Sequence, residues 1–204
     1  QNYKQAAYWF EKAAKKGEAY AQYCLGLYYA NGEGVEQDYK KAFYWLEKAA
    51  EQGEQIAQKD LGDLYFEGKG MEQNYKKAAE WYEKAAEQGY AKAQFSLGVA
   101  YANGNGVEQD YKKATEWSQQ AAEQGNQFAQ FNLGVAYANG DGVEQDYKKA
   151  AEWYEKAAEQ GNQIVQFKVG VTYANGDGVE QNYKKAAEWY EKAAEQGNQF
   201  AQFN

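Results

Sequence analysis

The 204-residue sequence predicts an all-α fold, an α-solenoid in which pairs of helices stack as copies of one 36-residue unit. Three observations support this fold class. The 21 glycines fall on four positions of the unit: one at its end, one within its first half and two that bracket a loop. The chain has no proline, which would interrupt helices. The six tryptophans recur every 36 residues, at Trp9, Trp45, Trp81, Trp117, Trp153 and Trp189.

The repeat sets the domain organisation, one continuous array over residues 1–204. Residues 1–17 correspond to the second half of a unit, and residues 198–204 to the start of another. The chain therefore reads as a segment of a longer protein or as an engineered array. The complete units are residues 18–53, 54–89, 90–125, 126–161 and 162–197.

The unit 126–161 illustrates the first helix. Ala129, Leu133 and Tyr137 recur at i, i+4 and i+8, a helical stripe that we expect to face the core. Gly134 within this helix costs roughly 1 kcal/mol relative to alanine. Because every unit keeps this glycine, we expect another helix to pass too close for a side chain.

A loop and a capping residue separate the two helices. The sequence Asn-Gly-Asp-Gly at 139–142 ends the first helix, since glycine adopts the left-handed conformation readily. Val143 is the one apolar loop residue, and we expect it to fill the gap between the helices. Asp146 is a natural N-cap for the second helix. The same position holds Asn2, Asp38, Asn74, Asp110 and Asn182.

The second helix is amphipathic and ends at Gly161. Lys148, Glu152 and Lys156 have the i, i+4 spacing of surface ion pairs on its polar side. The apolar side is predicted to hold Tyr147, Ala150, Trp153, Tyr154, Ala157 and Ala158.

The two ends are predicted to be weak. Residues 1–17 lack a preceding first helix, so one side of Tyr3, Trp9 and Phe10 should lack cover. Residues 198–204 are too short for a stable helix alone. No polar capping repeat is visible, so we expect frayed ends or end-to-end self-association.

Charge and composition exclude several classes of partner. The net charge of −8 disfavours nucleic acid and anionic membranes. No run of 18 apolar residues exists, so membrane insertion is not expected. Cys24 is the only cysteine, which excludes an intrachain disulfide and leaves the redox compartment open.

The residue types give little support for catalysis or for metal binding. Without histidine, the chain lacks the commonest base and zinc ligand, and Cys24 has no histidine to activate it. The loop 139–146 superficially resembles a calcium loop, but Val143 occupies a position that needs an oxygen ligand. We therefore predict no metal, no cofactor and no enzymatic activity. A weak hydrolase that uses Asp60 and Asp63 is a remote alternative.

The pattern of fixed residues resembles the Sel-one-like repeat family, relatives of the tetratricopeptide repeat. The match runs over the whole chain and is specific. It departs at Glu144 and its equivalents, where the family often has proline. The near identity of the units also suggests recent duplication or consensus design. In 126–161 the match is carried by Ala129, Leu133, Gly134, Tyr137, Gly140, Gly142, Val143, Asp146, Lys149, Ala150, Trp153, Ala157, Ala158 and Gly161.

The resemblance implies a right-handed superhelix of antiparallel helix pairs. It also implies adaptor proteins that assemble complexes, including secreted or periplasmic bacterial ones. The localisation is therefore open between the periplasm or exterior and the cytoplasm of a bacterium. Some bacterial relatives have a disulfide in each repeat, which cannot form here.

Residues that vary between units are the candidate recognition sites. By analogy with tetratricopeptide arrays, unit positions 3, 7, 10, 11 and 14 of the first helix are predicted to line a concave groove. Position 3 holds Tyr20, Ile56, Lys92, Phe128 and Ile164. Position 7 holds Cys24, Asp60, Ser96, Asn132 and Lys168. Position 10 holds Leu27, Asp63, Val99, Val135 and Val171. Position 11 holds Tyr28, Leu64, Ala100, Ala136 and Thr172, and Glu67 stands at position 14.

Two functions remain open from the sequence. The first is a non-enzymatic scaffold that binds a peptide or protein partner on the concave face. The second is a structural or designed array with no dedicated ligand, in which the residues on unused faces vary between units without a functional reason. Asp60, Asp63 and Glu67 share one helix face and either receive a cationic group or form a solvated charged surface.

Overall fold

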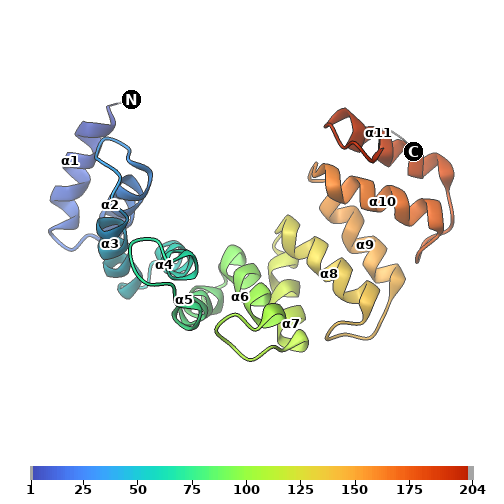
Figure 1. The fold of residues 1–204 in the computed structure, drawn as a ribbon, viewed down its shortest axis with the longest axis horizontal. Helices are drawn as coiled ribbons and strands as arrows, with labels where there is room; N and C mark the ends of the chain where they lie inside the picture. Colours follow the sequence, from blue (N-terminus) through green and yellow to red (C-terminus); the bar gives the residue numbers. More distant parts are fainter. Residues whose placement is uncertain (1, 202–204) are drawn as a thin grey trace. The chain divides into compact units, whose positions relative to one another are not determined.

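The computed structural model describes residues 2–201, and over these residues the chain forms eleven α-helices and no strand (Figure 1). The all-α prediction is therefore confirmed. The chain divides into two compact units, Gln1–Gln109 and Asp110–Asn204, which we call the N-terminal and C-terminal units. No helix in the described part of the chain is long and apolar enough to cross a bilayer.

The N-terminal unit holds six helices that pack in chain order. Helices α2 and α3 form one pair and α4 and α5 the next, while α1 packs on α2, α3 on α4 and α5 on α6. Their bounds are α1 Tyr3–Ala14, α2 Ala19–Asn31, α3 Tyr39–Glu51, α4 Gln55–Glu67, α5 Tyr75–Glu87 and α6 Ala91–Asn103.

The C-terminal unit repeats this arrangement. Helices α8 and α9 form a pair, as do α10 and α11, with α7 packed on α8 and α9 on α10. The predicted first and second helices of the repeats are thus present, and within each unit consecutive helices pack on each other. The bounds are α7 Tyr111–Glu123, α8 Gln127–Asn139, α9 Tyr147–Ala158, α10 Gln163–Asn175 and α11 Tyr183–Glu195.

The predicted caps are confirmed. The Asp146 side chain accepts a hydrogen bond of 3.0 Å from the backbone N–H of Lys149, and Gly140 ends α8 in the left-handed conformation. The equivalent cap side chains behave in the same way at Asn2, Asp38, Asn74, Asp110 and Asn182.

The predicted core stripe of α8 is confirmed at Ala129 and Leu133, which are fully buried, while Tyr137 is half-buried. Gly134 is required by packing, because a Cβ there would lie 2.6 Å from the ring of Tyr154 on α9. Small residues in this helix therefore let the tyrosine ring lie flat against its backbone.

The apolar side of α9 is mostly as predicted. Ala150, Tyr154, Ala157 and Ala158 are buried in one cluster with residues of α10, and Trp153 is half-buried. Tyr147 was predicted on this face, but it is 51% exposed, so that prediction is wrong. It stands at the first position of α9, and its hydroxyl accepts a hydrogen bond of 3.0 Å from the side chain of Gln145.

The second loop glycine makes the closest contact between consecutive repeats. Gly142 has φ of 73°, and a Cβ there would overlap the backbone of Tyr111 at the start of α7, in the preceding repeat. The same relation joins Gly34 to Tyr3, Gly70 to Tyr39, Gly106 to Tyr75 and Gly178 to Tyr147. Each loop therefore rests directly on the backbone of the preceding repeat.

A row of buried glutamines, which sequence reasoning missed, also joins the repeats. The Gln130 side chain donates a hydrogen bond of 3.2 Å to the carbonyl of Ala122 near the end of α7, and its own carbonyl accepts from Gln160 at 2.8 Å. Gln22, Gln58 and Gln166 do the same with their neighbours. Each of these carbonyls also accepts a backbone N–H from the residue three positions later, so the glutamine adds a second hydrogen bond that links the carbonyl to the following repeat.

The predicted surface ion pairs are replaced by another contact. No ion pair joins Lys148, Glu152 and Lys156 within the part of the chain that the structure describes. The Lys156 ammonium instead lies 3.9 Å from the centre of the Trp153 ring, a cation–π contact. The tryptophan three residues earlier competes with the glutamate for the lysine.

The first helix shows the exposure expected of a half repeat. Tyr3 is 44% exposed and Trp9 is 58% exposed, while Phe10 packs against the small cluster of Ala14, Ala21 and Leu25. At the other end, residues 199 and 200 form a turn and Ala201 lies in a 3₁₀ helix, and the remaining residues of the predicted short segment lie outside the described part.

Alanine at Gly142 should destabilise the protein by more than about 3 kcal/mol, because it adds a backbone overlap to the strain of a positive φ. Gly125 is the control: its φ is 86°, but a Cβ at this position would have no atom within 4 Å, so Gly125→Ala should cost only about 1–2 kcal/mol. Urea denaturation followed by circular dichroism measures both. Equal losses for the two variants would show that the loop contact does not constrain the fold.

Leucine at Gln130 should destabilise the protein by about 1–3 kcal/mol, because it removes two hydrogen bonds, one to the buried carbonyl of Ala122 and one from the side chain of Gln160. Gln119→Leu is the control, since its exposed amide bonds only Glu123 on the same helix and should change stability by less than about 0.5 kcal/mol. Thermal or urea unfolding compares the two. If the Gln130→Leu protein is as stable as wild type, the row of glutamines does not stabilise the contact between repeats.

Candidate functional site

The variable positions of the first helices differ in burial. Position 3 is exposed in Tyr20, Ile56, Lys92, Phe128 and Ile164. Positions 7 and 10 are half-buried, apart from Cys24, which is buried. Glu67 at position 14 is exposed. These positions lie at the boundary between the packed and the open side of the helix.

Position 11 was predicted on the open face, and the structure corrects this. Leu64, Ala100, Ala136 and Thr172 are buried and Tyr28 is half-buried. The reason is the helical period: Ala136 follows Ala129 at i+7 and Leu133 at i+3, so it continues the core stripe. Variation at position 11 therefore reflects packing.

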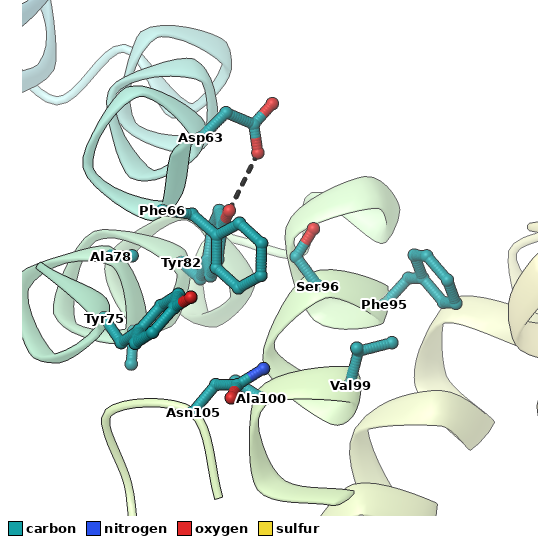
Figure 2. A pocket seen from close by; sticks show the side chains of 11 residues that line it. Asp63, Phe66, Tyr75, Ala78, Tyr82, Phe95, Ser96, Val99, Ala100 and Asn105 are labelled. Carbon is teal, nitrogen blue, oxygen red and sulfur yellow. Dashed lines mark hydrogen bonds between the residues drawn. The ribbon is translucent and has the colours of Figure 1, made fainter. Parts of the chain in front are cut away.

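One pocket brings several variable residues together in the N-terminal unit. It has a volume of about 250 Å³ and opens between α4, α5 and α6 (Figure 2). Of the predicted residues it gathers Asp63, Ser96, Val99 and Ala100; the other predicted residues do not line it. The full lining is Asp63, Phe66, Tyr75, Ala78, Ala79, Tyr82, Phe95, Ser96, Val99, Ala100 and Asn105.

Sequence reasoning missed the aromatic walls of this pocket. Tyr75 and Tyr82 belong to the second helix of the repeat, and Phe66 lies outside the chosen arc of the first. A signal did exist for Phe66, because the other complete units have alanine at that position. The side chain of Gln73 donates a hydrogen bond of 2.7 Å to the carbonyl of Phe66 and holds the end of α4 in place.

The size of the residue at position 7 separates this pocket from its counterpart in the C-terminal unit. Tyr82 lies against Gly62 as Tyr154 lies against Gly134. Over Tyr154, however, the ammonium of Lys168 stands 5.4 Å from the ring centre. Ser96 occupies the equivalent position beside Tyr82, and its short side chain lines the pocket together with the ring, which is 5% exposed (Figure 2).

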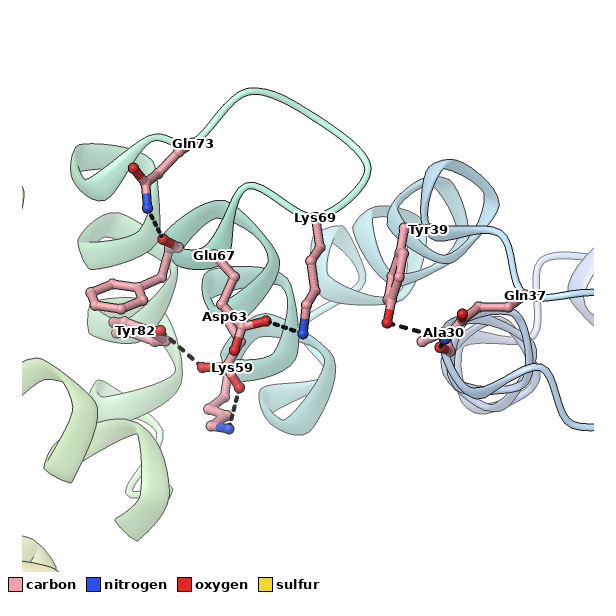
Figure 3. A network of polar contacts seen from close by, with 10 residues as sticks. Ala30, Gln37, Tyr39, Lys59, Asp63, Glu67, Lys69, Gln73 and Tyr82 are labelled. Carbon is pink, nitrogen blue, oxygen red and sulfur yellow. Dashed lines mark hydrogen bonds and ion pairs between the residues drawn. The ribbon is translucent and has the colours of Figure 1, made fainter.

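The acidic residues of α4 are held by groups of the same chain (Figure 3). The Tyr82 hydroxyl donates a hydrogen bond of 2.9 Å to Oδ1 of Asp63, and the Lys59 ammonium pairs with Oδ2. Lys59 also lies 3.7 Å from Asp60, while Lys69 pairs with Glu67 at 2.6 Å. Within the described residues, no group of three or more carboxylate or thiol side chains is arranged to hold a metal ion.

Burial shapes the titration of these groups. Burial raises the pKa of the Asp60 carboxyl above its usual value, although the Lys59 charge acts in the opposite direction. Burial and the nearby Asp63 carboxylate raise the pKa of Tyr82, so its hydroxyl remains a donor at all ordinary pH values. Burial likewise raises the pKa of the Cys24 thiol, which keeps it protonated and poorly nucleophilic at neutral pH.

Comparison with protein families identifies the repeat. The model of the Sel1 repeat matches six consecutive segments, residues 1–18, 19–54, 55–90, 91–126, 127–162 and 164–198. These segments cover nearly all of the chain. A comparison with curated proteins finds no match.

Solved structures show the same fold. The crystal structure of c5321, described as a protective antigen present in uropathogenic Escherichia coli strains and displaying an SLR fold, is 44% identical over 96% of this chain, with a TM-score of 0.93. A Sel1 repeat protein from Oxalobacter formigenes is 40% identical over 96% of the chain, with a TM-score of 0.86. The chain covers 42% and 57% of these two proteins, so it spans about half their length.

A more distant structure is that of the immunity protein PA5088 from Pseudomonas aeruginosa. It is 25% identical over 91% of this chain, which covers 67% of it, and the TM-score is 0.55. The same helical repeat is thus retained at low sequence identity.

Asp60→Asn should stabilise the protein at pH 7 and lose this effect as the pH falls. Because burial raises the folded-state pKa of Asp60, its ionised form costs folding free energy at neutral pH. That cost disappears below the unfolded-state value of about 4, where the carboxyl is protonated in both states. Thermal unfolding of both proteins between neutral and acidic pH measures the difference.

Asp177→Asn is the control, since this exposed aspartate stands where another repeat has Asn105. It should leave stability at pH 7 unchanged within about 0.5 kcal/mol. A neutral-pH stability for Asp60→Asn at or below wild type would mean that Lys59 more than offsets the burial of the carboxylate.

Proposed function

Since the chain belongs to the Sel1 repeat family, we propose that it is a non-enzymatic scaffold that binds a peptide or protein partner along the faces of its first helices. Sel1 repeat proteins are generally protein-interaction scaffolds. The description of one relative as an immunity protein supports a protein partner. The proposal concerns which face of the chain binds, what kind of partner it binds and how the two come into contact.

The pocket between α4, α5 and α6 is the observation that carries this proposal. It is lined by three residues at the variable positions 7 and 10, while the fixed glycines and alanines are used in stacking. Variation at exposed and half-buried positions beside a fixed stacking framework is what a changeable recognition surface requires.

The exposed apolar residues at position 3 extend this surface. Ile56, Phe128 and Ile164 each stand at the start of a first helix, and they are 38%, 59% and 64% exposed. Aromatic and branched side chains on an open helix face are common anchors for an extended peptide or an amphipathic helix. We call positions 3, 7 and 10 of the first helices the variable face.

Selection of binders from a displayed library of random peptides tests the proposal. Peptides that bind wild type should bind the Phe128→Ala/Ile164→Ala double variant, or the Ile56→Ala variant, at least about tenfold more weakly, which is about 1.4 kcal/mol. Tyr183→Ala is the control, because it removes an equally exposed apolar side chain from a second helix. Circular dichroism checks that helicity is unchanged.

Two results would contradict the scaffold proposal. One is that no specific peptide is enriched, which favours a structural array without a dedicated ligand. The other is that the variable-face variants and Tyr183→Ala bind every selected peptide as wild type does.

A further inference from the structure

We propose that the pocket between α4, α5 and α6 receives a lysine side chain of the partner, whose methylene stem fills the apolar interior and whose ammonium group lies over Tyr82 beside Asp63. This inference rests on the proposed function and specifies one contact of the partner. It assigns different roles to three residues: Tyr82 as a cation-binding ring, Asp63 as the anionic rim and Ser96 as the residue that keeps the pocket open.

The C-terminal unit shows what the equivalent space accepts. There the chain's own Lys168 extends from α10 and places its ammonium 5.4 Å from the centre of the Tyr154 ring. Tyr154 and Tyr82 occupy the same unit position, and both rings pack against the glycine within the first helix of their repeat. A lysine side chain therefore fits over a ring in this setting, and the N-terminal unit lacks one because Ser96 replaces it.

The residue at the rim of the pocket, at position 10, also differs between the two units. Position 10 holds Val135 beside Tyr154, but Asp63 beside Tyr82. Asp63 directs Oδ1 toward the Tyr82 hydroxyl, at 2.9 Å, so its carboxylate stands at the edge of the open space (Figure 2). Position 10 is thus apolar where Lys168 lies over the ring, and it is a carboxylate, paired with Lys59 of the same helix, where Ser96 takes the place of that lysine.

The pocket interior suits the stem of this side chain. Phe66, Val99, Ala78 and Ala100 supply apolar surface, and the volume of about 250 Å³ lies below the range of about 300–1,000 Å³ usual for whole small-molecule ligands. One long side chain is therefore a better match than a drug-sized ligand. Long basic side chains commonly bury their methylenes while the charge stays at a polar edge.

The charge of the chain favours a basic partner. The net charge is −8, which attracts cationic peptides and speeds their encounter. Lys59 already pairs with Asp63, so an incoming ammonium either shares the carboxylate or displaces Lys59 toward Asp60, 3.7 Å away. The site can therefore accept a cation without leaving its own lysine unpaired.

Titration with Nα-acetyl-lysine methylamide, followed by the amide resonances of isotopically labelled full-length protein, tests the inference. We expect saturable shifts centred on Ser96, Val99 and Ala100. The norleucine analogue, which has the stem but no ammonium group, should bind at least about tenfold more weakly. Equal or tighter binding of the norleucine analogue would reduce the site to an apolar pocket and overturn the proposal.

Substitutions borrowed from other repeats separate the three roles. Ser96→Lys copies Lys168 and should abolish the shifts, while Ser96→Ala leaves the space open and should bind as wild type. Asp63→Val copies Val135 and should weaken binding at least about tenfold. In the C-terminal unit, Val135→Asp with Lys168→Ser should create a second lysine site around Tyr154.

Three results would overturn the lysine assignment: no saturable shift at tens of millimolar probe, binding that survives Ser96→Lys, or tighter binding of the arginine analogue. The scaffold proposal fails separately, because it is tested with unselected peptides and with residues outside this pocket. If selected peptides need the variable face but bind equally well to Ser96→Lys, the scaffold proposal stands and the lysine pocket falls.

Discussion

The contact between each loop glycine and the backbone of the preceding repeat sets the geometry on which the rest of the structure depends. At Gly142 the loop lies so close to Tyr111 that no side chain fits, and the backbone also has a positive φ that favours glycine. The contact fixes how far each loop stands from the preceding second helix. Within each of the two units, successive helix pairs are thereby held in one register.

Close approach also explains the composition of the core. Alanine, with no rotamers to lose, occupies most buried positions of the second helices, and the tyrosine rings lie against the glycine in the neighbouring helix. The close approach also places a buried glutamine of each first helix within hydrogen-bond distance of a carbonyl near the end of the preceding second helix. One spacing therefore accounts for the glycines, the alanines and the glutamines together.

The sequence was sufficient to predict the parts of the fold that depend on local periodicity. The helix pairs, the Asp146-type caps and the core role of Ala129 and Leu133 all follow from residues a few positions apart. The glutamines were missed because their partner is a carbonyl of another repeat, which no local pattern records. Position 11 was misassigned because variability was taken as exposure, although Ala136 continues the helical stripe of the core.

The candidate site was only partly predictable for a related reason. Comparison of the units identified Asp63, Ser96 and Val99 as variable, but a pocket requires that residues of three helices be small or large in the right combination. Ser96 lines the pocket beside Tyr82, which packs against Gly62, and Phe66 forms a wall where other repeats have alanine. Such a combination becomes visible only once the helices are placed.

The paired exchange at positions 7 and 10 shows how recognition can change while stacking does not. Lys168 with Val135 and Ser96 with Asp63 stand in equivalent surroundings, against the same ring and the same glycine. Neither exchange touches the loop contact, the buried alanines or the glutamine row. Because these positions are only half-buried, each accepts a charged or an apolar residue without a large change in core packing. An array of nearly identical repeats can therefore hold different sites along its length, with the site determined by two or three residues per repeat.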